Sequence, residues 1–202
     1  MVHEAPDSIK ELVEDFEENE YQYKNSSVFD EENTKVKFLN PFFEALGWDL
    51  RNNNQYAPQF QEVEFEDSIK VGSSVKSPDY SFKIGGQRIF FVEAKKPSVD
   101  IEEDKEPALQ VRRYGWTVGL PLCILTDFET LAVYDTTIKP NKHQSASIAR
   151  VKLYHYSQYV EKWDEIYNIF SKEAILKGKF DKFAKGISKI EKSGTSQFDK
   201  NF

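Results

Sequence analysis

The sequence lacks several features that would assign it to a common class of protein. It contains a single cysteine, Cys123, among 202 residues, which excludes a disulfide framework and a cysteine zinc site. No apolar run approaches the roughly 20 residues that cross a membrane. The N-terminal segment is acidic and has no signal-peptide pattern. We therefore expect a cytoplasmic protein without a membrane segment.

An excess of positive charge is also missing. The chain has 27 lysines and arginines against 34 acidic residues, and its net charge of −7 disfavours general affinity for nucleic acid. The three histidines, His3, His143 and His155, are far apart in the sequence, and no Ser-His-Asp pattern accompanies them. The sequence therefore supports neither a histidine metal site nor a serine hydrolase.

What is present indicates a folded domain, since 39% of the residues are hydrophobic and 14% are aromatic. Ser8 and Glu11 have the spacing of a capping box at a helix start. A polar loop is expected over 20–30. The clearest amphipathic helix spans 31–46, and its apolar residues recur at helical spacing: Val36, Leu39, Phe42, Phe43 and Leu46.

Runs rich in β-forming residues and further helical patterns follow. Gly85-Gly86 separates two of these runs, which predicts a hairpin, and both faces of the second run are apolar, as in a central strand. Strands are expected over 61–66, 80–84, 89–94, 121–126, 131–135 and 150–156, and helices over 102–117, 157–170 (capped by Ser157) and 173–184. This order predicts an α/β fold with a central mixed β-sheet flanked by helices.

Two acids and a lysine are the most informative polar residues. Asp79 directly precedes one strand of the predicted hairpin, while Glu93 and Lys95 lie at the end of the other. Residues i and i+2 of a strand share a face, so Glu93 and Lys95 project together. Two acids can bind a hard divalent cation, and a nearby ammonium can stabilise negative charge. Charges beside a buried strand need such partners.

The length of the hairpin loop decides whether the two acids meet. A two-residue Gly85-Gly86 loop in a regular ladder would pair Asp79 with Val92 and point Asp79 away from Glu93. A three-residue loop, or one bulge, would pair Asp79 with Glu93 instead. We therefore predict a three-residue loop or a bulge.

Three further polar residues lie on predicted helices. Gln110 and Tyr114 are four residues apart and share a helix face, and both side chains can hydrogen-bond phosphate or water. Glu31 stands at the start of the long helix, where an acid ordinarily complements the helix dipole. It would join a site only if that helix packs beside the hairpin.

Together these residues resemble the PD-(D/E)xK nuclease superfamily. Pro78-Asp79 and Glu93-Ala94-Lys95 match its two defining segments, and Gln110-x-x-x-Tyr114 resembles the extra motif of its RecB-like branch. Longer segments resemble the N-terminal endonuclease domain of type IIG and type ISP restriction–modification enzymes and, more distantly, the type I R-subunit nuclease domain: 38–49, 77–86, 90–101, 109–116 and 125–135.

The resemblance implies a restriction-endonuclease-like core and a division of the chain. An N-terminal helix and loop at 1–30 would precede a nuclease domain at 31–185. A polar tail or linker at 186–202 would lead to downstream domains. Those domains would be a methyltransferase and a target-recognition domain. The setting would be the prokaryotic cytoplasm.

The resemblance also implies roles for the residues. Asp79, Glu93 and the carbonyl of Ala94 would bind Mg²⁺, for which Mn²⁺ is expected to substitute. Glu31, which precedes Thr34-Lys35, would assist the metal directly or through water. Lys95 would orient or deprotonate the attacking water and stabilise the charged transition state. Gln110 and Tyr114 would complete the catalytic set, and the residues expected to bind DNA are Lys96, Arg112 and Arg113.

The resulting prediction is a Mg²⁺-dependent endonuclease domain that hydrolyses double-stranded DNA to a 5′-phosphate and a 3′-hydroxyl. Because one active site cuts one strand, duplex cleavage predicts two copies that meet on DNA. Two alternatives stay open. One is a catalytically silent DNA-binding or docking module on the same fold, and the other is a repair or recombination nuclease.

Overall fold

A six-stranded β-sheet forms the centre of the molecule in the computed structural model, which describes residues 2–198. The strand order is β1-β4-β5-β6-β7-β8, and β5 and β6 are parallel while the other neighbours are antiparallel. The strands are β1 (Val63–Phe65), β4 (Tyr80–Ile84), β5 (Gln87–Ala94), β6 (Leu122–Thr126), β7 (Thr130–Asp135) and β8 (Arg150–His155). The predicted mixed sheet is confirmed.

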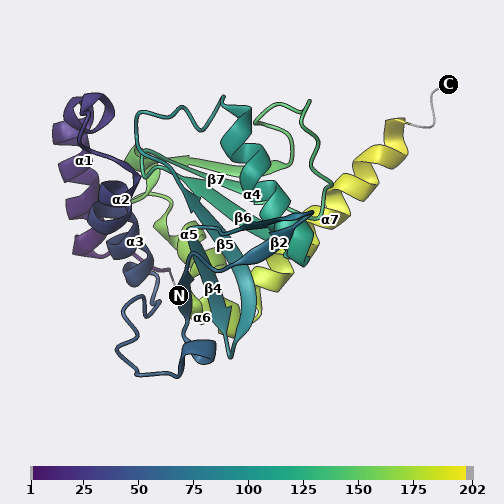
Figure 1. The fold of residues 1–202 in the computed structure, drawn as a ribbon, viewed down its shortest axis with the longest axis horizontal. Coiled ribbons are helices and arrows are strands. Elements are labelled where there is room, and N and C mark those ends of the chain that lie inside the picture. Colours follow the sequence, from purple (N-terminus) through teal and green to yellow (C-terminus); the bar gives the residue numbers. More distant parts are fainter. Residues whose placement is uncertain (1, 199–202) are drawn as a thin grey trace.

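Helices cover both faces of this sheet, so the fold has three layers (Figure 1). The helix α4 (Lys105–Val118) covers one face and buries Phe91 of β5, whereas Phe90 and Val92 face the larger core on the other side. That larger core includes residues of α1 (Asp7–Asn25), α3 (Asn40–Ala45), α5 (Trp163–Phe170), α6 (Lys172–Leu176) and α7 (Lys179–Phe198), and the short helix α2 (Glu31–Thr34) precedes α3 in the chain. The prediction of a central strand covered on both faces is confirmed.

The β4–β5 hairpin contains the predicted bulge. Gly85 and Gly86 form a two-residue turn, and both have a positive φ (57° and 83°), which glycine adopts without strain. Phe82 pairs with Phe90 but Lys83 pairs with Arg88, so Ile89 is the extra residue. Tyr80 therefore pairs with Val92. One step further along both strands, Asp79 comes opposite Glu93, as the register hypothesis required.

The helix predicted over 31–46 forms with one irregularity. Its middle is a π-helical turn, Lys35–Leu39, in which the Asn40 N–H bonds to the carbonyl of Lys35. Pro41 follows directly, and a proline cannot continue regular α-helical bonding because it lacks an N–H. The extra residue rotates the preceding side chains. Val36 is consequently exposed and Phe38 buried, which corrects the predicted apolar stripe at Val36.

Other boundaries differ from the prediction. The first helix runs to Asn25 and has no side-chain cap, so the Ser8 capping box is wrong. His155, not Ser157, caps the short turn Tyr156–Gln158 before α5. The last helix runs from Lys179 to Phe198 instead of ending near residue 184, while 199–202 of the expected polar tail lie outside the described residues.

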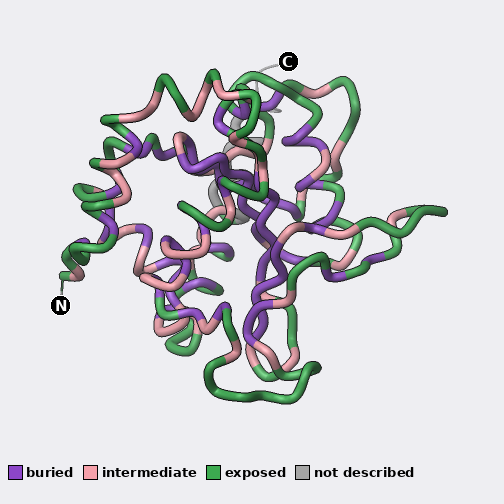
Figure 2. The backbone as a smooth tube through the Cα atoms, turned by 60° about the vertical axis from the view of Figure 1, so that its left-hand side comes forward, coloured by how far each residue is buried: buried purple, intermediate pink, exposed green. Residues whose placement is uncertain are grey.

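A small hairpin was not foreseen. It consists of β2 (Ile69–Val71) and β3 (Ser74–Lys76), which pair only with each other, and it projects as an arm from the body of the molecule (Figure 2). Ile69 anchors it in the core under α4. Among the described residues, no helix is long and apolar enough to span a membrane.

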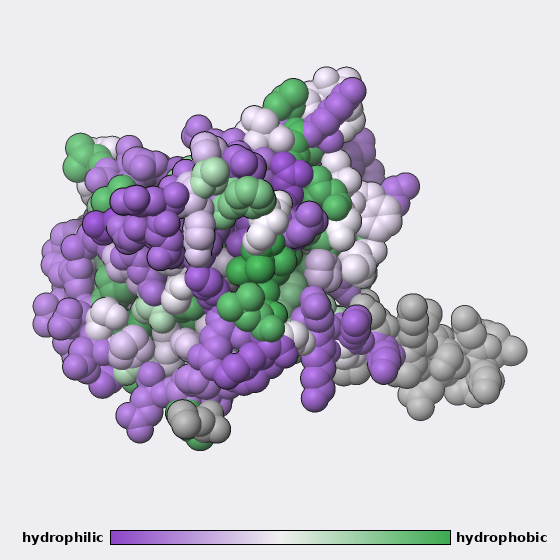
Figure 3. Space-filling model, turned by 90° about the horizontal axis from the view of Figure 1, so that it is seen from below, coloured by the Kyte–Doolittle hydropathy of each residue, from purple (hydrophilic) through white to green (hydrophobic). Residues whose placement is uncertain are grey.

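The end of the sheet at the Gly85-Gly86 turn carries apolar side chains. A groove of about 450 Å³ there is lined partly by the exposed residues Tyr56, Phe60 and Leu176. The molecule seen from below shows a hydrophobic patch within a mostly hydrophilic surface (Figure 3). Because Asp79 and Glu93 lie at the opposite end of the same two strands, this groove is separate from the residues predicted to be functional.

Candidate active site

The predicted acidic and basic residues gather at one end of the β4–β5 pair. Tyr80 and Phe82 of β4 and Phe90, Val92 and Ala94 of β5 all face the larger core. Strand alternation therefore directs the residues between and beside them toward α4. Asp79, Glu93 and Lys95 are among these residues, so the bulge places both acids and the lysine on one face.

Asp79 is held from two sides. Its Oδ2 accepts a hydrogen bond from the backbone N–H of Ala94 at 2.8 Å, which ties the start of β4 to the end of β5. Its Oδ1 accepts from Lys35 Nζ at 3.2 Å. Lys35 belongs to the π-helical turn and also bonds to Glu32 at 2.9 Å. The net effect of these two acids raises the pKa of Lys35 although burial lowers it.

Glu93 is the most deeply buried acid of the group, with 3% of its surface exposed. Its Oε1 accepts from Lys95 Nζ at 2.8 Å and from Gln110 Nε2 at 2.6 Å. Its Oε2 is buried and has no hydrogen-bond partner among the described residues. Burial and then the charge of Asp79 raise the pKa of Glu93 to about 7, against the opposing charge of Lys95. An unpartnered carboxylate oxygen in such a place can accept a bond from a ligand.

Lys95 lies between two acids. Its ammonium donates to Glu93 and is 3.5 Å from Glu31 Oε2. Burial lowers the pKa of Lys95, but the charges of Glu93 and Glu31 more than offset it, so the pKa is raised overall. Burial raises the pKa of Glu31 despite the nearby Lys95. The helix that begins at Glu31 thus packs beside the hairpin, which was the condition for Glu31 to join the site.

Gln110 and Tyr114 are placed by α4. Gln110 Nε2 donates both to Glu93 and to the Tyr114 hydroxyl, at 2.6 and 2.8 Å. Because the hydroxyl oxygen accepts that bond, its own proton remains available to another acceptor. Burial raises the pKa of Tyr114, which keeps the phenol neutral. Gln110 and Tyr114 therefore continue along α4 the chain of hydrogen bonds that starts at the Glu93 carboxylate.

The three predicted DNA contacts differ in position. Lys96 follows the site directly and is exposed, and Arg113 is exposed on α4. Arg112 is only 2% exposed, and its Nη1 donates to Gln144 of the β7–β8 loop at 2.8 Å. Two positions along a helix correspond to nearly opposite faces, so Arg112 turns away from Gln110. The structure therefore corrects Arg112 from a DNA contact to a buried residue that holds a loop.

Lys35 was not assigned a role from the sequence, although its contact with Asp79 makes it part of the cluster. In the sequence, the Thr34-Lys35 pair served only to locate Glu31. The missed signal was its spacing: Lys35 follows Glu31 by four residues, so both project from one helix face. The sequence did not show that this face meets Asp79.

The donor set fits a small hard cation. Mg²⁺ is usually bound through one or two carboxylates and keeps several waters. Asp79 and the unpartnered Oε2 of Glu93 would supply those carboxylates. Within residues 2–198, no group of three or more histidine, cysteine or acidic side chains is arranged to hold a metal. A cation here would therefore depend on two acids, a main-chain carbonyl and water.

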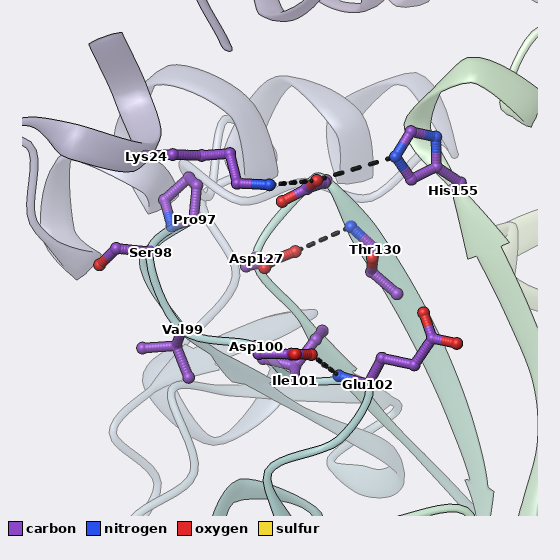
Figure 4. Close-up of a pocket in the computed structure, with 11 residues that line it drawn as sticks. Lys24, Pro97, Ser98, Val99, Asp100, Ile101, Glu102, Asp127, Thr130 and His155 are labelled. Carbon is purple, nitrogen blue, oxygen red and sulfur yellow. Dashed lines mark hydrogen bonds and ion pairs between the residues drawn. The ribbon is translucent and has the colours of Figure 1, made fainter. Parts of the chain in front are cut away.

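A cavity of about 280 Å³ lies at the same end of the sheet (Figure 4). Asp127 directly follows β6 and is 2% exposed, and its Oδ1 accepts from the Thr130 N–H at 2.8 Å. Lys24 is bonded to Glu129 across the cavity at 2.7 Å. Asp100 and Glu102 also line it. With three acids besides Asp127 and with its lysine already paired, the cavity would repel phosphate.

The mixed sheet, with two acids and a lysine where β4 and β5 meet, defines the class: a restriction-endonuclease-like domain. Within that class, the chain belongs to the family described as "Type I restriction enzyme R protein N terminus", whose model matches residues 28–142. The type II restriction enzyme and methyltransferase RM.Eco57I of Escherichia coli is 39% identical over 177 residues, 87% of this chain. The chain spans 18% of that relative's length.

A solved structure is also similar. The crystal structure of the type IIG restriction endonuclease BpuSI matches with a TM-score of 0.43 and 21% identity, over 67% of this chain and 17% of that chain. Both kinds of enzyme named in the resemblance, type I and type II, thus appear among the similar proteins. The predicted membership of the N-terminal domain of restriction enzymes is confirmed.

Proposed function

We propose that this chain is the Mg²⁺-dependent DNA endonuclease domain of a restriction–modification enzyme. The observation that carries the proposal is the buried, unpartnered Oε2 of Glu93, which lies in a cluster with Asp79 and Lys95. A buried carboxylate oxygen without a donor is unfavourable by about 1–3 kcal/mol or more. A site that leaves this oxygen unpaired is suited to a ligand that binds it. The family and the 39% identical relative supply the class of reaction.

Asp79 and Glu93 would hold the cation, with the carbonyl of Ala94 and, directly or through water, Glu31. When bound, Mg²⁺ polarises the phosphoryl group and lowers the pKa of coordinated water, and Mn²⁺ would serve in its place. The main-chain N–H of Ala94 fixes the Asp79 carboxylate, because it bonds to Oδ2 and leaves Oδ1 facing Lys35. If the Lys35 ammonium moved away, Oδ1 of Asp79 would be free to bind the metal ion.

Lys95 is positioned to act on the attacking water. Its ammonium has three donors, of which the contacts with Glu93 and Glu31 use two. The remaining donor can hold a water, and its charge can stabilise the negative charge that develops on the phosphate. Gln110 keeps the Glu93 carboxylate in place, while the free Tyr114 proton can bond a phosphate oxygen.

The partners follow from the proposed reaction. Double-stranded DNA would be the substrate, and two copies would meet on it to cut both strands. Methyltransferase and target-recognition domains would follow in a parent protein, because the relative is named as both restriction enzyme and methyltransferase and this chain corresponds to 18% of it. Sequence recognition would then come from outside this domain.

Plasmid cleavage tests the proposal. Supercoiled plasmid would be incubated with the chain and Mg²⁺, or with EDTA, and nicked and linear products would be quantified. We expect nicking with Mg²⁺ and none with EDTA, and loss of nicking in Asp79→Ala and Lys95→Ala. Asp127→Asn is the matched control, since it changes a buried acid at the end of the neighbouring strand. Equal nicking by all variants would reject the catalytic assignment, and no nicking by any protein would favour a silent DNA-binding module.

A further inference from the structure

We propose that Lys76 of the β2–β3 hairpin and Arg113 of α4 together bind the DNA sugar–phosphate backbone beside the phosphate that is cut. This inference rests on the proposed function and deepens it. It assigns a DNA-strand subsite to the small hairpin, whose residues 69–76 none of the sequence motifs singled out. The class of ligand is a phosphodiester of the same strand, one or two nucleotides from the reacting group.

A cavity of about 310 Å³ separates the hairpin from α4. Lys76 and Val71 line it from the hairpin, and Glu106, Leu109 and Arg113 line it from the helix. Gln110 and Tyr114 form the remaining wall. Since Gln110 is bonded to Glu93 at 2.6 Å, the cavity adjoins the candidate catalytic cluster through one side chain.

The two cationic side chains in this cavity are free to bind a ligand. Neither Lys76 nor Arg113 forms an ion pair with any residue in the described part of the chain, whereas Lys35, Lys83 and Arg88 are each paired with an acid. Glu106 is the one acid among the lining residues. A lysine and an arginine that line one cavity from two different elements provide the charge and the donors that a phosphate requires.

The neighbouring cavity at Asp127 provides a contrast on the same molecule. Besides Asp127, three acids line it, and its lysine is bonded to Glu129, so it would repel a phosphate group. Both cavities lie beside the candidate catalytic cluster. Charge therefore directs a DNA strand toward Lys76 and Arg113 and away from Asp127, in a protein whose net charge is −7.

The hairpin is built as an arm with a fixed base. Ile69 is buried in the core below α4, and Val71 packs against that core. All three residues of β3 are exposed, and the arm extends from the body into solvent (Figure 2). An anchored base with a fully exposed outer strand suits contact with a large, charged partner. Lys70, also exposed, adds a further cation to the arm.

Fluorescence anisotropy with a labelled 30-base-pair duplex, in Ca²⁺ to suppress cleavage, tests the inference. We expect Lys76→Gln/Arg113→Gln to bind about tenfold more weakly. The slope of log K against log salt should fall in magnitude by about 1.8, because each lost phosphate contact removes about 0.9. Lys139→Gln/Lys142→Gln is the matched control, because both lysines are exposed on the β7–β8 loop and form no described ion pair. The control should bind as the unaltered chain does.

The two proposals can fail separately. If the double variant binds with unchanged affinity and salt slope while Asp79→Ala still abolishes nicking, the hairpin subsite is wrong and the nuclease assignment stands. If the double variant loses binding but no protein nicks DNA, the subsite stands without catalysis. Circular dichroism melting of both double variants would identify a loss of binding that comes from unfolding. Absence of binding by the unaltered chain would overturn the subsite as well.

Discussion

Glu93 and Asp127 are two buried acids at the ends of adjacent parallel strands, and their surroundings differ. Both are at most 3% exposed, and burial raises the pKa of Glu93 to about 7 and of Asp127 to about 8. Asp127 accepts a bond from the backbone of its own turn. Glu93 is contacted by Lys95 and Gln110, lies beside Asp79, and keeps one oxygen without a partner.

This difference shows what identifies a candidate catalytic acid. Burial and a raised pKa are common to both residues, so neither feature separates them. What separates them is the direct bond from a lysine to the Glu93 carboxylate and the unpartnered oxygen of Glu93, whereas the lysine near Asp127 bonds to Glu129. Asp127 stabilises the β6–β7 turn through Thr130, whereas Glu93 is bonded both to Lys95 at the end of its own strand and to Gln110 of α4.

The largest expected effect distinguishes the two acids directly. Glu93→Gln should reduce Mg²⁺-dependent cleavage at least about 1,000-fold, or roughly 4 kcal/mol of barrier, because it removes a proposed cation ligand and leaves the shape nearly unchanged. Asp127→Asn should retain cleavage within about threefold. Single-turnover nicking rates would measure both. Comparable losses in the two variants would show that burial alone sets the effect.

Lys95 should follow in size. Lys95→Met keeps the length of the side chain but removes its charge, and we expect a loss of about 100-fold, which corresponds to roughly 2.7 kcal/mol. Single-turnover nicking at saturating Mg²⁺ separates this loss from weaker cation binding. The control is Lys139→Met, an exposed lysine of the β7–β8 loop outside the cluster, which should change the rate much less. A rate for Lys95→Met equal to that of the control would remove Lys95 from the catalytic set.

Asp127 should dominate a pH effect on stability. Its folded-state pKa of about 8 exceeds the ordinary aspartate value, so the folded protein holds a proton that the unfolded chain releases. Stability should therefore fall as pH rises from about 4 to 8, by at most about 1.4 kcal/mol per pH unit. Asp127→Asn can still accept the Thr130 bond but cannot ionise. The free energy of unfolding, measured in urea at pH 5 and at pH 7.5, should fall between these pH values by about 2 kcal/mol less in the variant than in the unaltered chain. An equal fall in both proteins would contradict this assignment.

Lys35 should give the smallest effect. Its ammonium is 3.2 Å from Asp79 Oδ1, the carboxylate oxygen that the Ala94 N–H leaves open. Lys35→Met should therefore tighten Mn²⁺ binding by about fivefold, close to 1 kcal/mol, measured by calorimetry without DNA. Lys37→Met is the control on the same helical segment, because Lys37 pairs with the distant Asp15. Weaker binding in Lys35→Met alone would show that Lys35 supports Asp79 instead of competing for it.

The parts of the site that follow strand and helix periodicity could be predicted from the sequence. Glu93 and Lys95 share a strand face, and Gln110 and Tyr114 share a helix face, because both relations depend only on local spacing. The pairing of Asp79 with Glu93 requires a bulge or a longer loop. The sequence shows this need, but it does not show where the extra residue lies. The structure places the extra residue at Ile89.

The remaining features depend on contacts between distant segments. Arg112 is adjacent to Arg113 in the sequence, yet only the position of the β7–β8 loop, with Gln144, makes one buried and the other exposed. The exposure of Val36 follows from the π-helical turn before Pro41. The β2–β3 hairpin has strands of three residues, which are too short to show a period.

The bulge at Ile89 makes the register of the hairpin a condition for the site. In a regular ladder through the same two-residue turn, Ile89 would pair with Phe82, and Val92 would pair with Asp79. Asp79 and Glu93 would then project from opposite faces of the sheet, although neither residue had changed. Deletion of Ile89 would instead keep Asp79 opposite Glu93, because it removes only the residue that has no partner on β4. The register of the two strands, and not the bulge residue itself, therefore joins the two acids, and a slip of one position would separate them as completely as loss of either acid.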